Sequence, residues 1–151
     1  WLLAFLLIHI ALYPQTAIQR SSSIKMDKIK VDAPFDMPEI LIPVFHDLPK
    51  YNIIDFGAEP MDKEKNALAI AEAINRASTT GGSVIIPAGD WLTKKIHLKS
   101  NINLHISEGA TLLFSEDPQD YLPAVFSSWE GLECYNYSPL IYAYGVKNVA
   151  I

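Results

Sequence analysis

Two stretches decide the fold: Tyr51-Asn-Ile-Ile-Asp-Phe-Gly-Ala58, and Gly81-Gly-Ser-Val-Ile-Ile-Pro-Ala-Gly89. The segment between them has apolar residues at helical spacing, namely Ala67, Ile70, Ala71, Ile74 and Ala77. We therefore predict a helix from Glu64 to Ser78, with Asp62 as its N-cap and Gly81-Gly82 at its end.

Short strand patterns surround this helix. We predict a first strand over 51–56 and later strands over 83–86, 96–98, 102–106, 111–114, 140–144 and 148–151. No second helix pattern follows, so short strands joined by short turns favour an all-β solenoid over a doubly wound sheet. In a solenoid the helix would cap the exposed apolar end of the first turn. The alternative is an ordinary crossover helix in an α/β sheet.

The order of the segments predicts a secreted fragment. Residues 1–17 hold an apolar run, Trp1 to Leu12, that suits a signal peptide whose start is missing, and a buried helix or a single membrane anchor are the alternatives. Residues 18–50 form a polar and then Pro-rich extended lead. Residues 51–151 form the first turns of a domain that we expect to continue beyond the fragment. The net charge of −5 does not suggest a nucleic-acid partner.

Several motifs resemble the start of a glycoside hydrolase family 28 polygalacturonase, in the branch that includes exo-acting enzymes. They are Asp55-Phe-Gly-Ala58, Gly81 to Gly89, Glu108-Gly-Ala-Thr-Leu112, Tyr137-Ser-Pro-Leu-Ile-Tyr142 and Asn148-Val-Ala-Ile151. The first two are shared with pectate-lyase-like proteins in general. Lys94-Lys95 is a departure, because the family more often has Thr-Gly there.

The resemblance implies a right-handed parallel β-helix and inverting hydrolysis of α-1,4 bonds between galacturonic acids in pectin. The family carries its catalytic residues on Asn-Thr-Asp, Asp-Asp, Gly-His-Gly and Arg-Ile-Lys motifs. None of these motifs occurs in this sequence. We therefore expect no catalytic residue in the fragment, and the fragment by itself to be inactive.

The sequence gives little support for a catalytic carboxyl pair or a metal site within these residues. Asp117 with Asp120, or Glu130 with Glu133, are the candidate carboxyl pairs, but a turn cap and a solvated loop explain them better. The histidines and the single cysteine, Cys134, do not have metal-ligand spacing. We expect no cofactor and no metal.

Substrate contact is the open question. Trp129, Tyr135 and Tyr137 lie in an aromatic loop that we expect at the edge of a substrate groove. Lys94 and Lys95 could meet the carboxylates of a pectic polysaccharide, although a solvated face is the simpler interpretation. We expect no stable membrane association after signal cleavage. Two alternatives remain: a pectate-lyase-type polysaccharide lyase, and a non-catalytic carbohydrate-binding β-helix protein.

Overall fold

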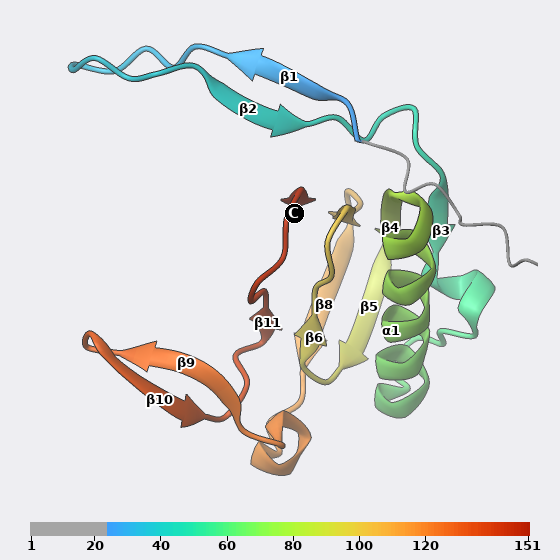
Figure 1. The fold of residues 1–151 in the computed structure, drawn as a ribbon. Coiled ribbons are helices and arrows are strands. Elements are labelled where there is room, and N and C mark those ends of the chain that lie inside the picture. Colours follow the sequence, from blue (N-terminus) through green and yellow to red (C-terminus); the bar gives the residue numbers. More distant parts are fainter. Residues whose placement is uncertain (1–23) are drawn as a thin grey trace, which may run out of the picture.

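The structure is a computed structural model that describes residues 24–151. The predicted signal peptide, residues 1–17, and the first residues of the lead lie outside the described part. The described chain is built mostly of short strands with one α-helix (Figure 1). Its elements are β1 (Met26–Ile29), β2 (Ile40–Pro43), β3 (Lys50–Asn52), a 3₁₀ helix η1 (Ile53–Phe56), α1 (Lys63–Thr80), β4 (Gly82–Ile86), β5 (Gly89–Thr93), β6 (Ile96–His97), β7 (Ile102–Ile106), β8 (Ala110–Phe114), a 3₁₀ helix η2 (Pro118–Tyr121), β9 (Val125–Trp129), β10 (Leu132–Asn136), β11 (Ile141–Tyr142) and β12 (Val149–Ala150).

Three of the sheets are parallel. The largest has the order β12-β7-β4-β3, and all of its neighbouring strands run in the same direction. The pairs β5–β8 and β6–β11 are also parallel. The chain passes through the three sheets in one order: β4, β5 and β6, then β7, β8 and β11, and then β12 in the first sheet again. Each pass therefore lies beside the previous one.

The core lies between α1 and these parallel strands. The alternation in 102–106 predicts that Ile102, Leu104 and Ile106 share a buried face. Ile102 and Leu104 of β7 are fully buried and pack with Val84 and Ile86 of β4, whereas Ile106 is 39% exposed. From the helix, the buried face is formed by Asn66, Ala69, Ile70, Ala73, Ile74 and Ala77. The predicted face is therefore slightly rotated, because Ala69 and Ala73 take the places expected for Ala67 and Ala71.

Both helix ends agree with their sequence signals. The Asp62 side chain accepts a hydrogen bond from the Lys65 amide at 3.0 Å, so it caps the helix as expected. Gly81 has a φ of 77°, a backbone conformation that glycine adopts without strain, and it ends the helix. The helix connects the adjacent parallel strands β3 and β4, as a crossover helix does. It also contacts β5 and β6 of the next two sheets.

Some predicted elements are wrong in detail. Only the beginning of the segment 51–56 is a strand, because the Asn52 side chain accepts a hydrogen bond from the Ile54 amide and starts the 3₁₀ helix η1. The segment expected to be an aromatic loop is instead an antiparallel hairpin, β9–β10. A second antiparallel hairpin, β1–β2, forms within the lead. Among the described residues, none of the helical segments is both long and apolar enough to cross a membrane.

Candidate functional site

A row of aromatic rings crosses from β6 to the β9–β10 hairpin. We call these five residues the aromatic row: His97, Tyr142, Tyr144, Phe126 and Tyr135. The ring centres of His97 and Tyr142 are 5.1 Å apart, and Tyr142 is stacked on Tyr144 with 11° between their planes. The ring centre of Phe126 lies 5.2 Å from that of Tyr144 and 5.8 Å from that of Tyr135. These separations are typical of favourable aromatic pairs, so the rings form one continuous surface.

Strand pairing places the row outside the core. His97 is opposite Tyr142 in the parallel pair β6–β11, next to the core residue Ile96 and its partner Ile141. Because side chains alternate along a strand, the isoleucines point inward and the two rings point outward. The Tyr142 hydroxyl donates to the Phe126 carbonyl at 2.7 Å. This bond joins the hairpin to the parallel strands.

The hairpin divides the predicted aromatic trio between its two faces. Tyr135 is opposite Phe126, and Trp129 is opposite Leu132. These two residue pairs are separated by an odd number of steps along the hairpin. Directly opposed residues share a face and successive pairs alternate, so Trp129 and Tyr135 lie on opposite faces. The exposed fractions are 68% for Trp129, 75% for Tyr135 and 50% for Tyr137, which follows the hairpin. All three rings are accessible, and Tyr135 belongs to the aromatic row.

The His97 ring is hydrogen-bonded to Ser138, which precedes β11. Its Nε2 lies 2.9 Å from the Ser138 hydroxyl, which also donates its single proton to the Pro139 carbonyl at 3.0 Å. When the Ser138 hydroxyl donates to the Pro139 carbonyl, Nε2 carries the proton in the His97–Ser138 hydrogen bond. Partial burial, and then the nearby charge of Lys95, lower the pKa of His97 below its ordinary value. The imidazole is thus neutral at neutral pH.

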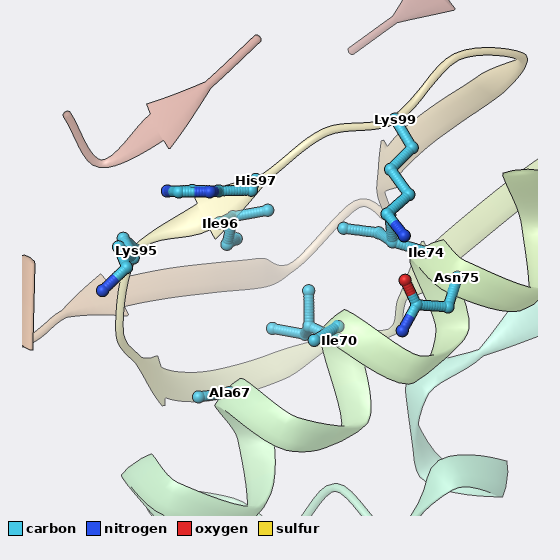
Figure 2. Close-up of a pocket in the computed structure, with 9 residues that line it drawn as sticks. Ala67, Ile70, Ile74, Asn75, Lys95, Ile96, His97 and Lys99 are labelled. Carbon is cyan, nitrogen blue, oxygen red and sulfur yellow. The ribbon is translucent and has the colours of Figure 1, made fainter. Parts of the chain in front are cut away.

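A groove of about 280 Å³ lies between α1 and β6, directly beside His97. Figure 2 shows Ile70, Ile74 and Ile96 along its middle, with Lys95 at one end and Lys99 near Asn75 at the other. It is lined by Ala67, Ile70, Ala71, Ile74, Asn75, Lys95, Ile96, His97 and Lys99. The groove combines an apolar floor with cationic ends, which suits a ligand that carries negative charge.

A second polar feature surrounds Asp120. We call Lys63, Lys94, Ser115 and Asp120 the Asp120 cluster. Lys63 Nζ lies 2.6 Å from Asp120 Oδ2, Lys94 Nζ lies 3.2 Å from Oδ1, and the Ser115 hydroxyl donates to Oδ2 at 2.5 Å. Hydrogen bonds from Lys63, Ser115 and Lys94 hold the pKa of the Asp120 carboxyl far below its ordinary range. The cluster ties the first turn of α1 to the turns that follow β5 and β8.

The two predicted lysines therefore have internal partners. Lys94 pairs with Asp120 and also with Glu64 at 2.7 Å. Lys95 donates to the backbone carbonyls of Asp120, at 3.0 Å, and Leu122. Lys99 is different, since its side chain has no hydrogen-bond or ion-pair partner among residues 24–151. Of the three neighbouring lysines, Lys99 is the one available to a ligand.

The candidate carboxyl pairs have simple structural roles. Asp117 caps η2 by accepting from the Gln119 amide at 2.9 Å, which agrees with the turn cap expected from sequence. Asp120 is enclosed by cations, and Glu130 and Glu133 are exposed on the hairpin. Within residues 24–151, no group of three or more His, Cys, Asp or Glu side chains could hold a metal ion.

Sequence reasoning missed four members of the aromatic row. Tyr142 and Tyr144 belong to the predicted strand 140–144, and His97 is an exposed residue of the predicted strand 96–98. Nothing in the sequence singles out Phe126. Gly131 is a sequence signal for a tight turn, and in the structure Glu130 and Gly131 both have positive φ, at 49° and 84°. This pair of conformations is that of a type I′ turn, which joins two strands with a two-residue loop.

Comparison with known proteins relates the chain to pectin-degrading enzymes. No protein-family model matches the chain. The exo-poly-α-D-galacturonosidase of Dickeya chrysanthemi is 40% identical over 70 residues, which is 46% of this chain and 12% of that protein.

Two solved structures are similar over most of the chain. The hyperthermoactive exopolygalacturonase from Thermotoga maritima is 43% identical with a TM-score of 0.60, and the match covers 72% of this chain and 24% of that one. The family 28 exopolygalacturonase of Yersinia enterocolitica is 31% identical with a TM-score of 0.52, and the match covers 72% of this chain and 19% of that one. This chain thus spans at most about a quarter of the length of each relative. The resemblance of the chain to glycoside hydrolase family 28 polygalacturonases is confirmed.

Proposed function

We propose that the chain is the opening part of a secreted glycoside hydrolase that cleaves α-1,4-galacturonosyl bonds of polygalacturonate by inverting hydrolysis. The observation that carries the proposal is the 43% identity, over 72% of the chain, to an exopolygalacturonase. The substrate would be pectin or a related uronic-acid polymer.

In this proposal the parallel pairs are the first turns of a right-handed parallel β-helix. The support is the repeated order of the sheets, in which β7, β8 and β11 lie beside β4, β5 and β6. Helix α1 would be the cap, because it lies against β5 and β6 on the side away from β8 and β11. A solenoid needs such a cover for the apolar end of its first turn.

The catalytic carboxyls would lie in the part of the protein that follows residue 151. An inverting hydrolase needs one protonated carboxyl and a second carboxylate about 6.5–9.5 Å away, with water between them. Asp120 is a poor general acid because its lowered pKa keeps it ionised. Its oxygens are also occupied by Lys63, Lys94 and Ser115.

The role that we propose for the described residues is to hold one end of the polysaccharide. Sugar rings have an apolar face that packs on aromatic rings, and the aromatic row offers such rings from β6, β11 and the hairpin. Trp129, on the opposite face of the hairpin, and Tyr137, just after the hairpin, are also exposed. Lys99, at the end of the α1–β6 groove, would meet a galacturonate carboxylate. The internal partners of Lys94 and Lys95 favour a structural role for these two residues over direct substrate contact.

The test starts from the complete reading frame that contains this sequence. Its product should release reducing ends from polygalacturonate without forming unsaturated sugars. Products that absorb ultraviolet light would instead indicate a polysaccharide lyase, which cleaves by elimination. Binding of the polymer without cleavage would indicate a carbohydrate-binding protein. The same reading frame should encode Asn-Thr-Asp and Asp-Asp motifs after residue 151. Replacing the aspartates of these motifs by asparagine should abolish hydrolysis.

A further inference from the structure

Both legs of the β9–β10 hairpin are attached at their base to the segment around β6. On the entering leg, Lys95 Nζ donates to the backbone carbonyls of Asp120, at 3.0 Å, and Leu122. On the leaving leg, the buried Ser138 is hydrogen-bonded to His97 Nε2 at 2.9 Å. Lys95 directly precedes β6 and His97 ends it (Figure 2), so one short strand holds both legs.

The two legs are also joined to each other. The Ser138 amide donates to the Tyr121 carbonyl at 3.0 Å. Tyr121 lies between the two residues whose carbonyls accept from Lys95. The contacts therefore form a closed ring, which runs from Lys95 to residues 120–122, on to Ser138 and back through His97. We call this ring the clamp.

The clamp matters because the rest of the hairpin has little support. β9 and β10 contact mainly each other, and residues 122–124, which lead into β9, are exposed. Beyond the clamp, the hydrogen bond from Tyr142 to the Phe126 carbonyl and the ring contact of Phe126 with Tyr144 join the hairpin to the stacked strands. Ring contacts act over a short range, so a small rotation of the legs would separate Phe126 and Tyr135 from the other rings of the aromatic row.

We propose that Lys95 is a positioning residue: it fixes the entering leg of the hairpin and so keeps Phe126 and Tyr135 in line with the other rings of the aromatic row. The consequence for polymer binding rests on the proposed function, which takes this row as a binding surface. A lysine suits the task, since its ammonium group has three donors and bonds both carbonyls at once. Such charge-assisted hydrogen bonds are roughly twice as strong as neutral ones.

The adjacent lysine offers a matched contrast. Among residues 24–151, Lys94 Nζ contacts only carboxylates, those of Glu64 at 2.7 Å and Asp120 at 3.2 Å. Without Lys94, the Asp120 carboxylate keeps Lys63 at 2.6 Å and Ser115 at 2.5 Å. Lys94 therefore supports the Asp120 cluster without touching the backbone that leads into the hairpin.

The test uses the product of the complete reading frame and hydrogen–deuterium exchange read by mass spectrometry. Peptides from residues 121–138 should be protected in the unmodified protein. Their exchange should be about tenfold faster in Lys95→Met, which keeps an apolar stem but has no donors, because the hairpin opens locally more easily. Lys95→Arg should restore most of the protection, since a guanidinium also donates to carbonyls. Lys94→Met should lower the unfolding midpoint and leave the exchange of these peptides unchanged.

Peptides from α1 report whether each variant is folded, and Lys95→Gln provides a milder change if Lys95→Met fails to fold. On polygalacturonate, Lys95→Met should raise KM about fivefold with little change in kcat, which is the size of effect expected for one lost aromatic contact. Lys95→Arg should bring KM back toward that of the unmodified protein.

Three results would overturn the positioning role: rapid exchange of the hairpin in the unmodified protein, unchanged exchange in Lys95→Met, or an equal effect of Lys94→Met. Faster exchange with an unchanged KM would overturn its consequence for the polymer. Hydrolysis by the unmodified protein is scored separately. If polygalacturonate is not hydrolysed but Lys95→Met frees the hairpin, the hydrolase is rejected and the positioning role is supported.

Discussion

The side chain of Asn66 and the backbone of Leu92 are joined by a hydrogen bond of 2.9 Å between Nδ2 and the carbonyl oxygen. On its other side, Asn66 Oδ1 accepts from the Glu59 amide, also at 2.9 Å. Asn66 is fully buried in the first turn of α1. One amide group therefore connects the helix to β5 and to the loop that precedes the helix.

Asn66→Ala should be among the most destabilising substitutions in the helix. It leaves the Glu59 amide and the Leu92 carbonyl without partners, and an unsatisfied buried group costs about 1–3 kcal/mol. The measurement is the free energy of unfolding of the full-length protein in denaturant. Asn75→Ala, on an exposed part of the same helix, is the control and should have a small effect. Equal effects of the two substitutions would contradict the role of the buried amide.

Gly82→Ala should disrupt the pairing of β3 with β4. A Cβ at this position would lie 2.6 Å from the Pro49 carbonyl oxygen and 2.8 Å from the ring of Tyr51. Since a backbone oxygen cannot turn aside, we expect a loss of about 1–3 kcal/mol, as for other overpacked sites. Gly57→Ala is the matched control, because a Cβ there meets nothing within 4 Å and the cost comes only from its φ of 89°. Thermal unfolding of both variants tests the comparison, and the explanation fails if Gly57→Ala is the more harmful.

Thr93→Val should stabilise the protein. The Thr93 side chain is fully buried and its hydroxyl has no hydrogen-bond partner among residues 24–151. Valine has nearly the same shape and removes this unsatisfied group, so a gain of about 1 kcal/mol is expected. Thr93→Ser, which keeps the hydroxyl and removes a methyl group, should destabilise. A loss of stability with valine would show that the hydroxyl is satisfied, for example by a buried water molecule.

The Asp120 cluster should lose its contribution to stability in acid. The folded-state pKa of Asp120 lies below that of the unfolded chain, where a carboxyl titrates at about 3.9. The contribution is therefore complete above the unfolded value and is lost as the pH falls through about 4 toward the folded pKa. Unfolding curves of the parent protein and Asp120→Asn, measured from pH 7 to pH 3, should converge as the pH falls. A difference that stays constant over this range would contradict the prediction.

Tyr135→Ala should weaken the binding of polygalacturonate by the full-length enzyme. An aromatic contact is worth about 1 kcal/mol, so KM should rise about fivefold with little change in kcat. Trp129→Ala removes an exposed ring from the opposite face of the same hairpin and is the matched comparison. If Trp129→Ala raises KM and Tyr135→Ala does not, the substrate runs along the other face. If neither changes KM, the hairpin does not contact the polymer.

The elements that could be predicted from sequence are those whose signals are local. The strand 102–106 has the predicted bounds because its apolar and polar residues alternate, and Gly81 ends α1 because its positive φ requires a residue such as glycine. β5 was missed, since Gly89 and Asp90 resemble a turn. Pairing with β8, which is more than ten residues away along the chain, makes it a strand.

The candidate site was less predictable for a related reason. The sequence indicated exposed aromatic residues near Trp129, but the aromatic row depends on which face of the hairpin each ring occupies. That face is fixed by register, through the turn at Glu130-Gly131 and the pairing of Tyr142 with His97. The partners of Lys94 and Lys95 were also hidden, because Asp120 comes close to them only when consecutive turns stack.

The β9–β10 hairpin is inserted in the chain between β8 and β11. After it, β11 still pairs in parallel with β6, with Ile141 opposite Ile96 and Tyr142 opposite His97. The stacked strands therefore do not depend on the length of what is inserted between them. Such an insertion can be lengthened, shortened or replaced during evolution, or in the laboratory, without a change in the scaffold. Exchanging residues 125–136 for the corresponding segment of a related protein should therefore leave the pairing of β6 with β11 in place.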